Sequence, residues 1–178
     1  CHAMGAVWIF DNKDMTIIDI GGQDTKIICV EQGFVKDFMM NDKCSAGTGR
    51  FLEIMANTLS MRPNEMCELA REGSGVTISS MCTVFAESEV ISLIGQGEKK
   101  ENIAFAVVDS IVRKVAAQAN RMSEDRPMLC LTGSLCECSY ISEALTKELG
   151  MEVKTDPQSR YAGAIGAALG AVKKGKKN

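Results

Sequence analysis

Histidine, proline and aromatic residues are scarce in this chain of 178 residues, which contains one His, three Pro and one Trp. The single histidine, His2, has only Cys1 beside it in the sequence, so a catalytic Cys–His or Ser–His pair is not expected. No apolar run reaches the roughly 18 residues of a membrane span, and no secretory signal is present, so we expect a cytoplasmic protein without a membrane partner. The net charge of −3 gives no indication of nucleic acid binding.

Cysteine is abundant, with eight residues, but the Cys-x-x-Cys spacing of a zinc ribbon is absent. Since no secretory signal is present and the apolar content is 46%, reduced thiols are expected rather than disulfides. Cys29 and Cys130 lie in apolar strand patterns, which predicts buried and inert side chains. Cys136 and Cys138 have a spacing found in metal sites, but no second pair accompanies them.

The hydrophobic pattern predicts an α/β fold with a mixed sheet covered by helices. Three short strands joined by glycine-containing turns predict an antiparallel meander at 16–20, 25–30 and 34–40. Helices follow, with an extended segment at 76–79 between two of them, and then a strand, a helix, a strand and a last helix at 161–174. In that last helix Gly163, Ala167 and Gly170 are expected to permit close helix packing. Residues 1–6 carry no clear element.

The hairpin at 19–26 has acidic residues on both sides of Gly21-Gly22. Backbone N–H groups of such a turn can hold a phosphate, while Asp19 or Asp24 positions Mg²⁺ or a water. Gln23 would then orient that water. The alternative is an ordinary diglycine hairpin with solvated acids, and the hairpin alone does not decide between the two.

A second motif, 41–51, joins a strand to a predicted helix. Gly47 and Gly49 allow close approach of a ligand, and the start of a helix favours an anion. Cys44 lies at the entrance of this loop, where the same field favours thiolate. A third turn, Gly133-Ser134, ends a strand and is of a kind that accepts phosphorylated ligands.

Cys44 and Cys82 both precede predicted helices, with Thr83 the expected N-cap of the second. A cuboidal iron–sulfur cluster takes four cysteine ligands, so two such thiols per chain would require a symmetric dimer. From the spacing alone, two ordinary partly buried thiols remain the favoured interpretation.

Together, the segments 18–26, 41–51 and 82–90 resemble the signature of the 2-hydroxyacyl-CoA dehydratase activators, a group that includes the ATPase subunits of benzoyl-CoA reductase. The resemblance covers essentially the whole chain. It implies the ribonuclease-H-like, actin-type fold of acetate and sugar kinases, Hsc70 and actin. It also implies a homodimer that shares one [4Fe-4S] cluster, with Cys44 and Cys82 as ligands.

The resemblance further implies an ATP/ADP site with Mg²⁺. Gly21, Gly22, Gln23 and Asp24 would contact the phosphates, with Gln23 and Asp24 catalytic. Gly47, Thr48 and Gly49 would lie beside them, and Gly133, Ser134 and Gln158 would line the adenosine pocket. The implied activity couples ATP hydrolysis to transfer of one electron from ferredoxin or flavodoxin to an acyl-CoA dehydratase or reductase component.

Two departures from the family pattern stand out. The family's first lobe, with its Asp-x-Gly-Ser/Thr loop, is absent, so 1–178 is interpreted as the second lobe with an inserted subdomain at about 61–100. Alone, it is expected to bind nucleotide poorly and to hydrolyse little ATP. Cys136 and Cys138 also replace the more usual residues after Gly133-Ser134. Two other functions stay open: a sugar- or acyl-kinase-type phosphotransferase without a cluster, and a non-catalytic docking lobe.

Overall fold

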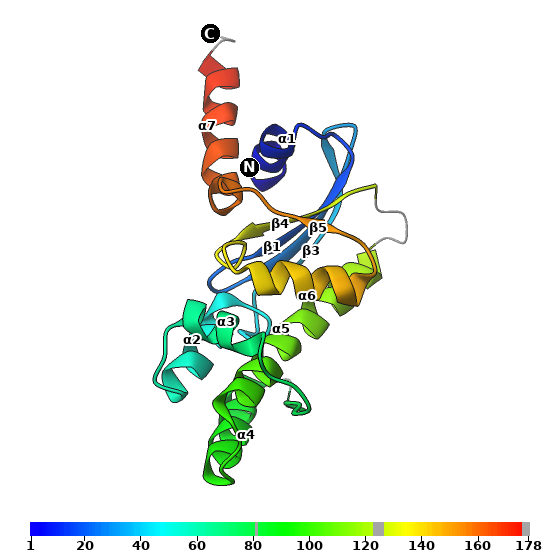
Figure 1. The fold of residues 1–178 in the computed structure, drawn as a ribbon. Coiled ribbons are helices and arrows are strands. Elements are labelled where there is room, and N and C mark those ends of the chain that lie inside the picture. The colour runs from blue at the N-terminus through cyan, green and yellow to red at the C-terminus, as the bar shows by residue number, and fades with distance from the viewer. Residues whose placement is uncertain (81, 123–126, 176–178) are drawn as a thin grey trace.

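A five-stranded mixed sheet forms the centre of the protein (Figure 1). The computed structural model describes residues 1–80, 82–122 and 127–175. The strand order is β3-β2-β1-β4-β5, with β1 antiparallel to β2, β2 antiparallel to β3, and parallel pairs β1–β4 and β4–β5. The strands are β1 (Met15–Ile20), β2 (Thr25–Glu31), β3 (Phe34–Asn41), β4 (Leu129–Gly133) and β5 (Val153–Lys154).

Helices cover both faces of this sheet (Figure 1). α1 and α7 lie together on one face, α5 and α6 cover the other, and α2, α3 and α4 extend beyond the hairpin end of β1. The helices are α1 (His2–Phe10), α2 (Gly49–Thr58), α3 (Pro63–Ala70), α4 (Thr83–Gly95), α5 (Lys100–Met122), α6 (Ser139–Leu149), the 3₁₀ turn η1 (Ser159–Tyr161) and α7 (Ala162–Gly175). No helix in the described ranges is long and apolar enough to cross a membrane.

The central strand β1 is buried along its whole length because both faces of the sheet are covered. Its alternate side chains enter two cores. Ile18 and Ile20 join the large core under α2, α3, α5 and α6. Met15 and Ile17 join a smaller core with α1. The Asp19 side chain therefore points to the same face as α1, at the end of β1 where the β1–β2 hairpin begins.

The predicted antiparallel meander is confirmed, and each of its three strands differs from the prediction by at most one residue at an end. One prediction is wrong: a helix, α1, occupies the start of the chain, where no clear element was expected. The segment 76–79 forms neither helix nor strand. α1 is apolar around almost its whole circumference, so no stripe in its sequence distinguishes one face from another. Its packing against α7 determines its position.

The close packing of α7 was predicted from Gly163, Ala167 and Gly170, and only Gly163 takes part in it: a Cβ on Gly163 would lie 2.9 Å from the His2 ring on α1. Ala167 is exposed, whereas Ala162 and Gly166 are buried against α1. A Cβ atom on Gly166 would lie 1.8 Å from the carbonyl oxygen of Cys1. Gly170 has nothing within 4 Å of its Cβ position, so it is not part of the contact.

Gly166 and Gly170 therefore form a matched pair for a stability test. Gly166→Ala forces two backbones apart, and we expect it to lower stability by about 1–3 kcal/mol. Gly170→Ala adds a better helix former in open space and is expected to raise stability by up to about 1 kcal/mol. Thermal denaturation followed by circular dichroism measures both. Equal melting temperatures for the two variants would contradict the α1–α7 packing.

Candidate functional site

Asp19 is the buried acid at the end of β1, with only 2% of its surface exposed. Its Oδ1 accepts a hydrogen bond of 2.8 Å from Thr132 Oγ1 on β4. Its Oδ2 faces Lys26 Nζ at 3.5 Å and His2 Nε2 at 3.3 Å. Lys26 Nζ also donates to Asp24 Oδ1 at 2.7 Å. One ammonium group therefore bridges the two carboxylates of the hairpin and fixes their positions.

Three segments that are far apart in the sequence meet at this hairpin. The Gly49 N–H donates to the Gly21 carbonyl at 2.9 Å, and the Arg50 N–H donates to the Gly22 carbonyl at 2.7 Å. From the β4–α6 turn, the Ser134 N–H donates to the Ile20 carbonyl at 2.8 Å. The hairpin, the loop at 41–51 and the Gly133-Ser134 turn thus form one continuous site.

Two of the glycines at this meeting point, Gly133 and Gly49, have close neighbours where a side chain would begin. Gly133 has a φ of +88°, and its Cβ would lie 2.4 Å from the Ile20 carbonyl oxygen. A Cβ on Gly49 would lie 2.9 Å from Ser134 Oγ and 3.3 Å from the Gly21 oxygen. Backbone therefore packs directly on backbone between β1, α2 and the β4–α6 turn, which is the reason for glycine here.

The start of α2 differs from its prediction in one detail. We expected the first amide groups of this helix to be available for an anion. Those of Gly49 and Arg50 instead donate to the hairpin carbonyls. The two bonds satisfy donors that a helix start leaves unpaired, and they attach α2 to the hairpin.

The rest of the loop is held from several sides. Thr25 Oγ1 on β2 donates to the Gly47 carbonyl at 2.7 Å, and Thr48 Oγ1 donates to the Ser45 carbonyl at 2.6 Å. Asn41 Nδ2 donates to the Cys44 carbonyl at 2.9 Å. The φ of Gly47 is +84°, a conformation that glycine adopts without strain. The Cys44 backbone is consequently fixed relative to β2 and β3.

Two predicted site residues lie at the exposed margin. Gln23 is exposed at the tip of the hairpin, beside the exposed Gly22. Gln158 precedes η1, its N–H donates to Asp156 Oδ1 at 2.8 Å, and η1 packs against β4. Gln158 therefore lies on the β4 side of the site.

Cys44 lies in the loop before α2, Cys82 lies at the start of α4, and the two segments meet. Cys82, not the predicted Thr83, is the N-cap residue of α4, and Thr83 begins the helix. The hydroxyl oxygens of Ser45 and Thr83 are hydrogen-bonded at 2.7 Å, so the residues that follow the two cysteines are in direct contact. Cys82 is exposed and Cys44 partly exposed. Lys114 Nζ on α5 donates to Cys44 Sγ at 3.7 Å.

The surroundings of the two thiols bear on their use as metal ligands. Within the described residues, no group of three or more His, Cys, Asp or Glu side chains is placed to hold a metal ion, and this applies equally to the Cys136–Cys138 segment. One chain thus offers two thiols here. Next to Cys82, the α4 side chains Val84 and Phe85 are 67% and 65% exposed. This apolar surface is suited to covering by another protein.

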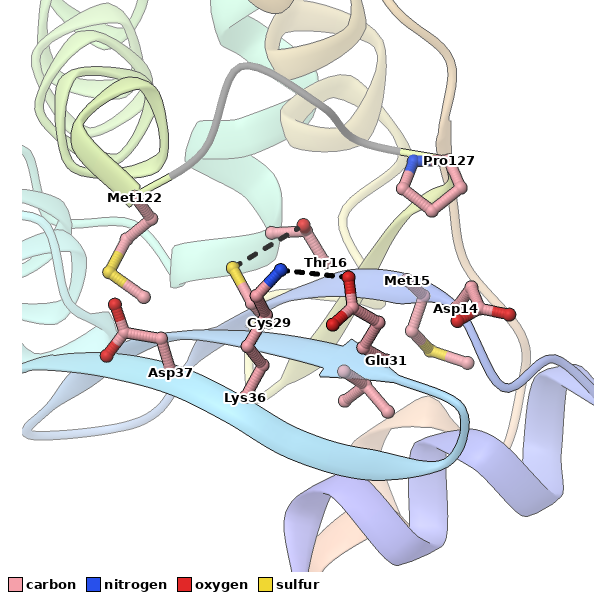
Figure 2. A pocket seen from close by; sticks show the side chains of 10 residues that line it. Asp14, Met15, Thr16, Cys29, Glu31, Lys36, Asp37, Met122 and Pro127 are labelled. Atoms are coloured by element: carbon pink, nitrogen blue, oxygen red, sulfur yellow. Dashed lines mark hydrogen bonds and ion pairs between the residues drawn. The ribbon is translucent and has the colours of Figure 1, made fainter.

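A pocket of about 550 Å³ lies at the opposite end of the sheet. Figure 2 shows Thr16 and Cys29 at its centre, with the Glu31–Lys36 ion pair beside them. It is formed at the start of β1 and the end of β2, away from the hairpin. None of the predicted site residues lines it. The pocket therefore has no part in the site described above.

Two polar residues of the site, Thr132 and Lys114, could not be identified as site residues from the sequence. Thr132 sits inside an apolar strand pattern, and its contact with Asp19 follows from the parallel β1–β4 pairing that places the two residues opposite each other. Lys114 lies in the middle of a long helix and reaches Cys44 only through tertiary packing. Neither contact joins residues at a fixed spacing, so neither could be predicted from the sequence.

The sheet order, the two helical layers and the glycine-lined hairpin define an α/β fold of the actin type. A family model described as the BadF/BadG/BcrA/BcrD ATPase family matches residues 1–171. The chain belongs to this family.

Individual relatives agree with this assignment. The chain is 48% identical over 178 residues to the (R)-2-hydroxyglutaryl-CoA dehydratase activating ATPase of Acidaminococcus fermentans, covering 99% of this chain and 68% of that protein. The crystal structure of component A of that dehydratase has a TM-score of 0.92 at 47% identity, with 98% of this chain and 67% of that one covered. The activator of the 2-hydroxyisocaproyl-CoA dehydratase from Clostridium difficile, solved with bound ADPNP, has a TM-score of 0.92 at 38% identity, with coverages of 99% and 66%. The chain thus spans about two thirds of the length of these relatives.

Proposed function

We propose that this chain is part of an ATP-dependent activator, an ATPase and one-electron donor that serves a 2-hydroxyacyl-CoA dehydratase or a benzoyl-CoA-reductase-type iron–sulfur enzyme. The observation that carries the proposal is the double attachment of the loop at 41–51. Gly49 and Arg50 bond it to the hairpin, and Ser45 bonds it to Thr83 beside Cys82. The names of its relatives, an activating ATPase and a dehydratase activator, support the same function.

The nucleotide would bind at the hairpin. In this proposal Gly21, Gly22, Gln23 and Asp24 contact the phosphates, and the carboxylate of Asp19 or Asp24 positions Mg²⁺ or water. Gly47, Thr48 and Gly49 lie next to them. Gly133, Ser134 and Gln158 form the adenosine side. The convergence of these segments at one end of β1 supports the assignment, and the ADPNP bound to a relative with a TM-score of 0.92 adds to it.

The chain's residues fit an iron–sulfur cluster that two subunits share. Cys44 and Cys82 are accessible, their segments are in contact, and the Lys114 ammonium group lies 3.7 Å from Cys44 Sγ. A [4Fe-4S] cluster takes four thiolates, so Cys44 and Cys82 from each of two copies would complete it. When bound, the cluster supplies the single electron that the acceptor enzyme needs. A ferredoxin or flavodoxin would act as its donor.

The division of the chain into lobes belongs to the same proposal. Residues 1–178 would form the second lobe, with about 61–100 as its insertion, and the further third of the relatives' length would complete the nucleotide site. This chain alone should therefore bind ATP weakly and hydrolyse little of it. ATP hydrolysis by residues 1–178 at the rate of an intact relative would contradict this division.

Iron content of the anaerobically prepared complete protein tests the function. We expect a brown dimer with about four irons. A colourless protein that phosphorylates a sugar or an acyl group would instead indicate a phosphotransferase. Tight, nucleotide-independent binding to a partner without iron would indicate a docking lobe.

A further inference from the structure

A lysine on the long helix α5 contacts the loop that contains Cys44. Lys114 lies at the edge of the buried face of α5, beside the buried Ile111 and Val115, and its own side chain is half-buried. Its ammonium Nζ donates to Cys44 Sγ at 3.7 Å, although the two residues are 70 positions apart in the chain. The sulfur that would bind iron therefore already accepts a hydrogen bond from a cationic group.

The aliphatic stem of this lysine lies against the glycine of the same loop. A Cβ atom on Gly47 would lie 3.2 Å from Lys114 Cδ, 3.4 Å from Cγ and 3.7 Å from Cβ. Long cationic side chains commonly pack their stem on a neighbour while the charged head reaches a polar group. Gly47 is itself held, because Thr25 Oγ1 donates to its carbonyl at 2.7 Å. The packing of the stem on Gly47 therefore determines where Nζ lies relative to Cys44.

Other charged groups close to this contact in the sequence come in pairs of opposite sign. Arg113, the residue before Lys114, forms an ion pair with Asp109 one turn earlier on α5. In the loop, the two exposed residues before Cys44, Asp42-Lys43, have one charge of each sign. Each pair adds little net charge beside the sulfur. Replacement of Lys114 by a neutral residue would therefore change the charge next to Cys44 by one unit.

We propose that Lys114 raises the midpoint potential of the [4Fe-4S] cluster, an inference that rests on the proposed function and on Cys44 as a ligand. One-electron reduction by ferredoxin or flavodoxin would add one negative charge at the four ligand sulfurs and the iron they hold. A positive charge and a hydrogen bond at a ligand sulfur stabilise that reduced state more than the oxidised one. Lys114 would act through Cys44 Sγ, so it is a positioning residue for electron transfer.

The size of this effect depends on the distance between Nζ and Sγ and on solvent. Lys114 also lines a cavity of about 260 Å³ together with Ser79, Ser80 and Ser110, so water screens its charge in part. Movement of the 41–51 loop away from α5 would increase the distance from Nζ to Cys44 Sγ and weaken the attraction. The midpoint potential would then fall, and the electron held there would become a stronger reductant.

A redox titration of the anaerobically prepared complete protein, followed by EPR, tests the inference. Lys114→Met keeps an unbranched stem over Gly47 and removes the charge. At a fixed solution potential we expect the ratio of reduced to oxidised cluster to fall about tenfold, which is a decrease of about 59 mV in the midpoint of a one-electron couple. The iron content should remain at about four per dimer, because no ligand is changed.

Two further variants serve as controls. Lys114→Arg keeps the positive charge and should have a midpoint close to that of the unmodified protein. Arg121→Met also removes one exposed cation from α5, but two helical turns further along, about 10 Å from Lys114. Screening by salt makes a charge at that distance weak, so its midpoint should not change. An equal decrease in Arg121→Met would assign the effect to overall charge and contradict the inference.

Iron content separates the possible failures. Full iron with an unchanged midpoint in Lys114→Met would overturn the role of Lys114 and leave the proposed function intact. Absence of iron from the unmodified protein would overturn both. Loss of iron from Lys114→Met alone would give this residue a structural role and would also overturn the inference. If Lys114→Met does not fold, Lys114→Gln, which is neutral and polar, provides the same comparison.

Discussion

Replacement of Cys82 by serine is expected to remove the iron from the anaerobically prepared protein, from about four irons per dimer to nearly none. Each chain provides two accessible thiols to the proposed cluster, so the change removes two of four ligands from the dimer. Serine is a preferred N-cap residue, and α4 begins directly after position 82. The variant should therefore fold, and loss of iron will report loss of a ligand.

The measurements are iron content, visible absorption and the EPR spectrum after reduction. Cys44→Ser should give the same loss of iron. This variant should also fold, because Asn41 Nδ2 still donates to the carbonyl of residue 44. Cys1→Ser is the matched control, since Cys1 is also an exposed thiol but lies on the α1 side of the sheet. A Cys82→Ser protein that retains a full cluster would exclude Cys82 as a ligand and would leave the phosphotransferase or docking interpretation.

Gly133→Ala should cause the largest loss of stability and nucleotide affinity among the glycine substitutions in the site. Its Cβ would lie 2.4 Å from the Ile20 carbonyl oxygen and 2.9 Å from Asp19 Oδ1, and its φ of +88° is strained for alanine. Strain of about 1–3 kcal/mol adds to a similar cost of displacing β1. Displacement of β1 would also move Asp19 and the hairpin.

Alanine substitutions at two further glycines give a scale for the stability loss expected from Gly133→Ala. Gly49→Ala should be milder, because its nearest neighbour at 2.9 Å is the rotatable Ser134 hydroxyl. Gly22→Ala meets nothing within 4 Å and should leave stability nearly unchanged. Thermal denaturation and calorimetric titration of the complete protein with ATP measure the series. Wild-type stability in Gly133→Ala would contradict the backbone contact between β1 and the β4–α6 turn.

The sequence indicates local secondary structure clearly, but it gives little indication of which distant residues contact each other. Runs of β-forming residues bounded by glycine turns were enough to predict β1, β2 and β3, because their pairing is between consecutive segments. The parallel pairing of β1 with β4 brings Asp19 to Thr132 across 113 residues, and no local pattern encodes it. α1 was missed for the same reason, since its glycine contact with α7 is made across the length of the chain.

The candidate site shows the same division. The glycine loops and the two cysteines before helices were visible in the sequence, because phosphate loops and helix starts have local chemical requirements. Two contacts could not be predicted from the sequence because they depend on tertiary packing. The amide groups of Gly49 and Arg50 donate to the hairpin carbonyls, and Lys114 contacts Cys44.

The loop at 41–51 is bonded to the hairpin at one end and to α4 at the other. If it transmits nucleotide state to the cluster, thermodynamic linkage requires the effect to run equally in both directions. A nucleotide that shifts the midpoint potential of the one-electron couple by about 59 mV must then have its own affinity changed tenfold by reduction of the cluster. The arrival of an electron would thereby set how tightly ATP is held.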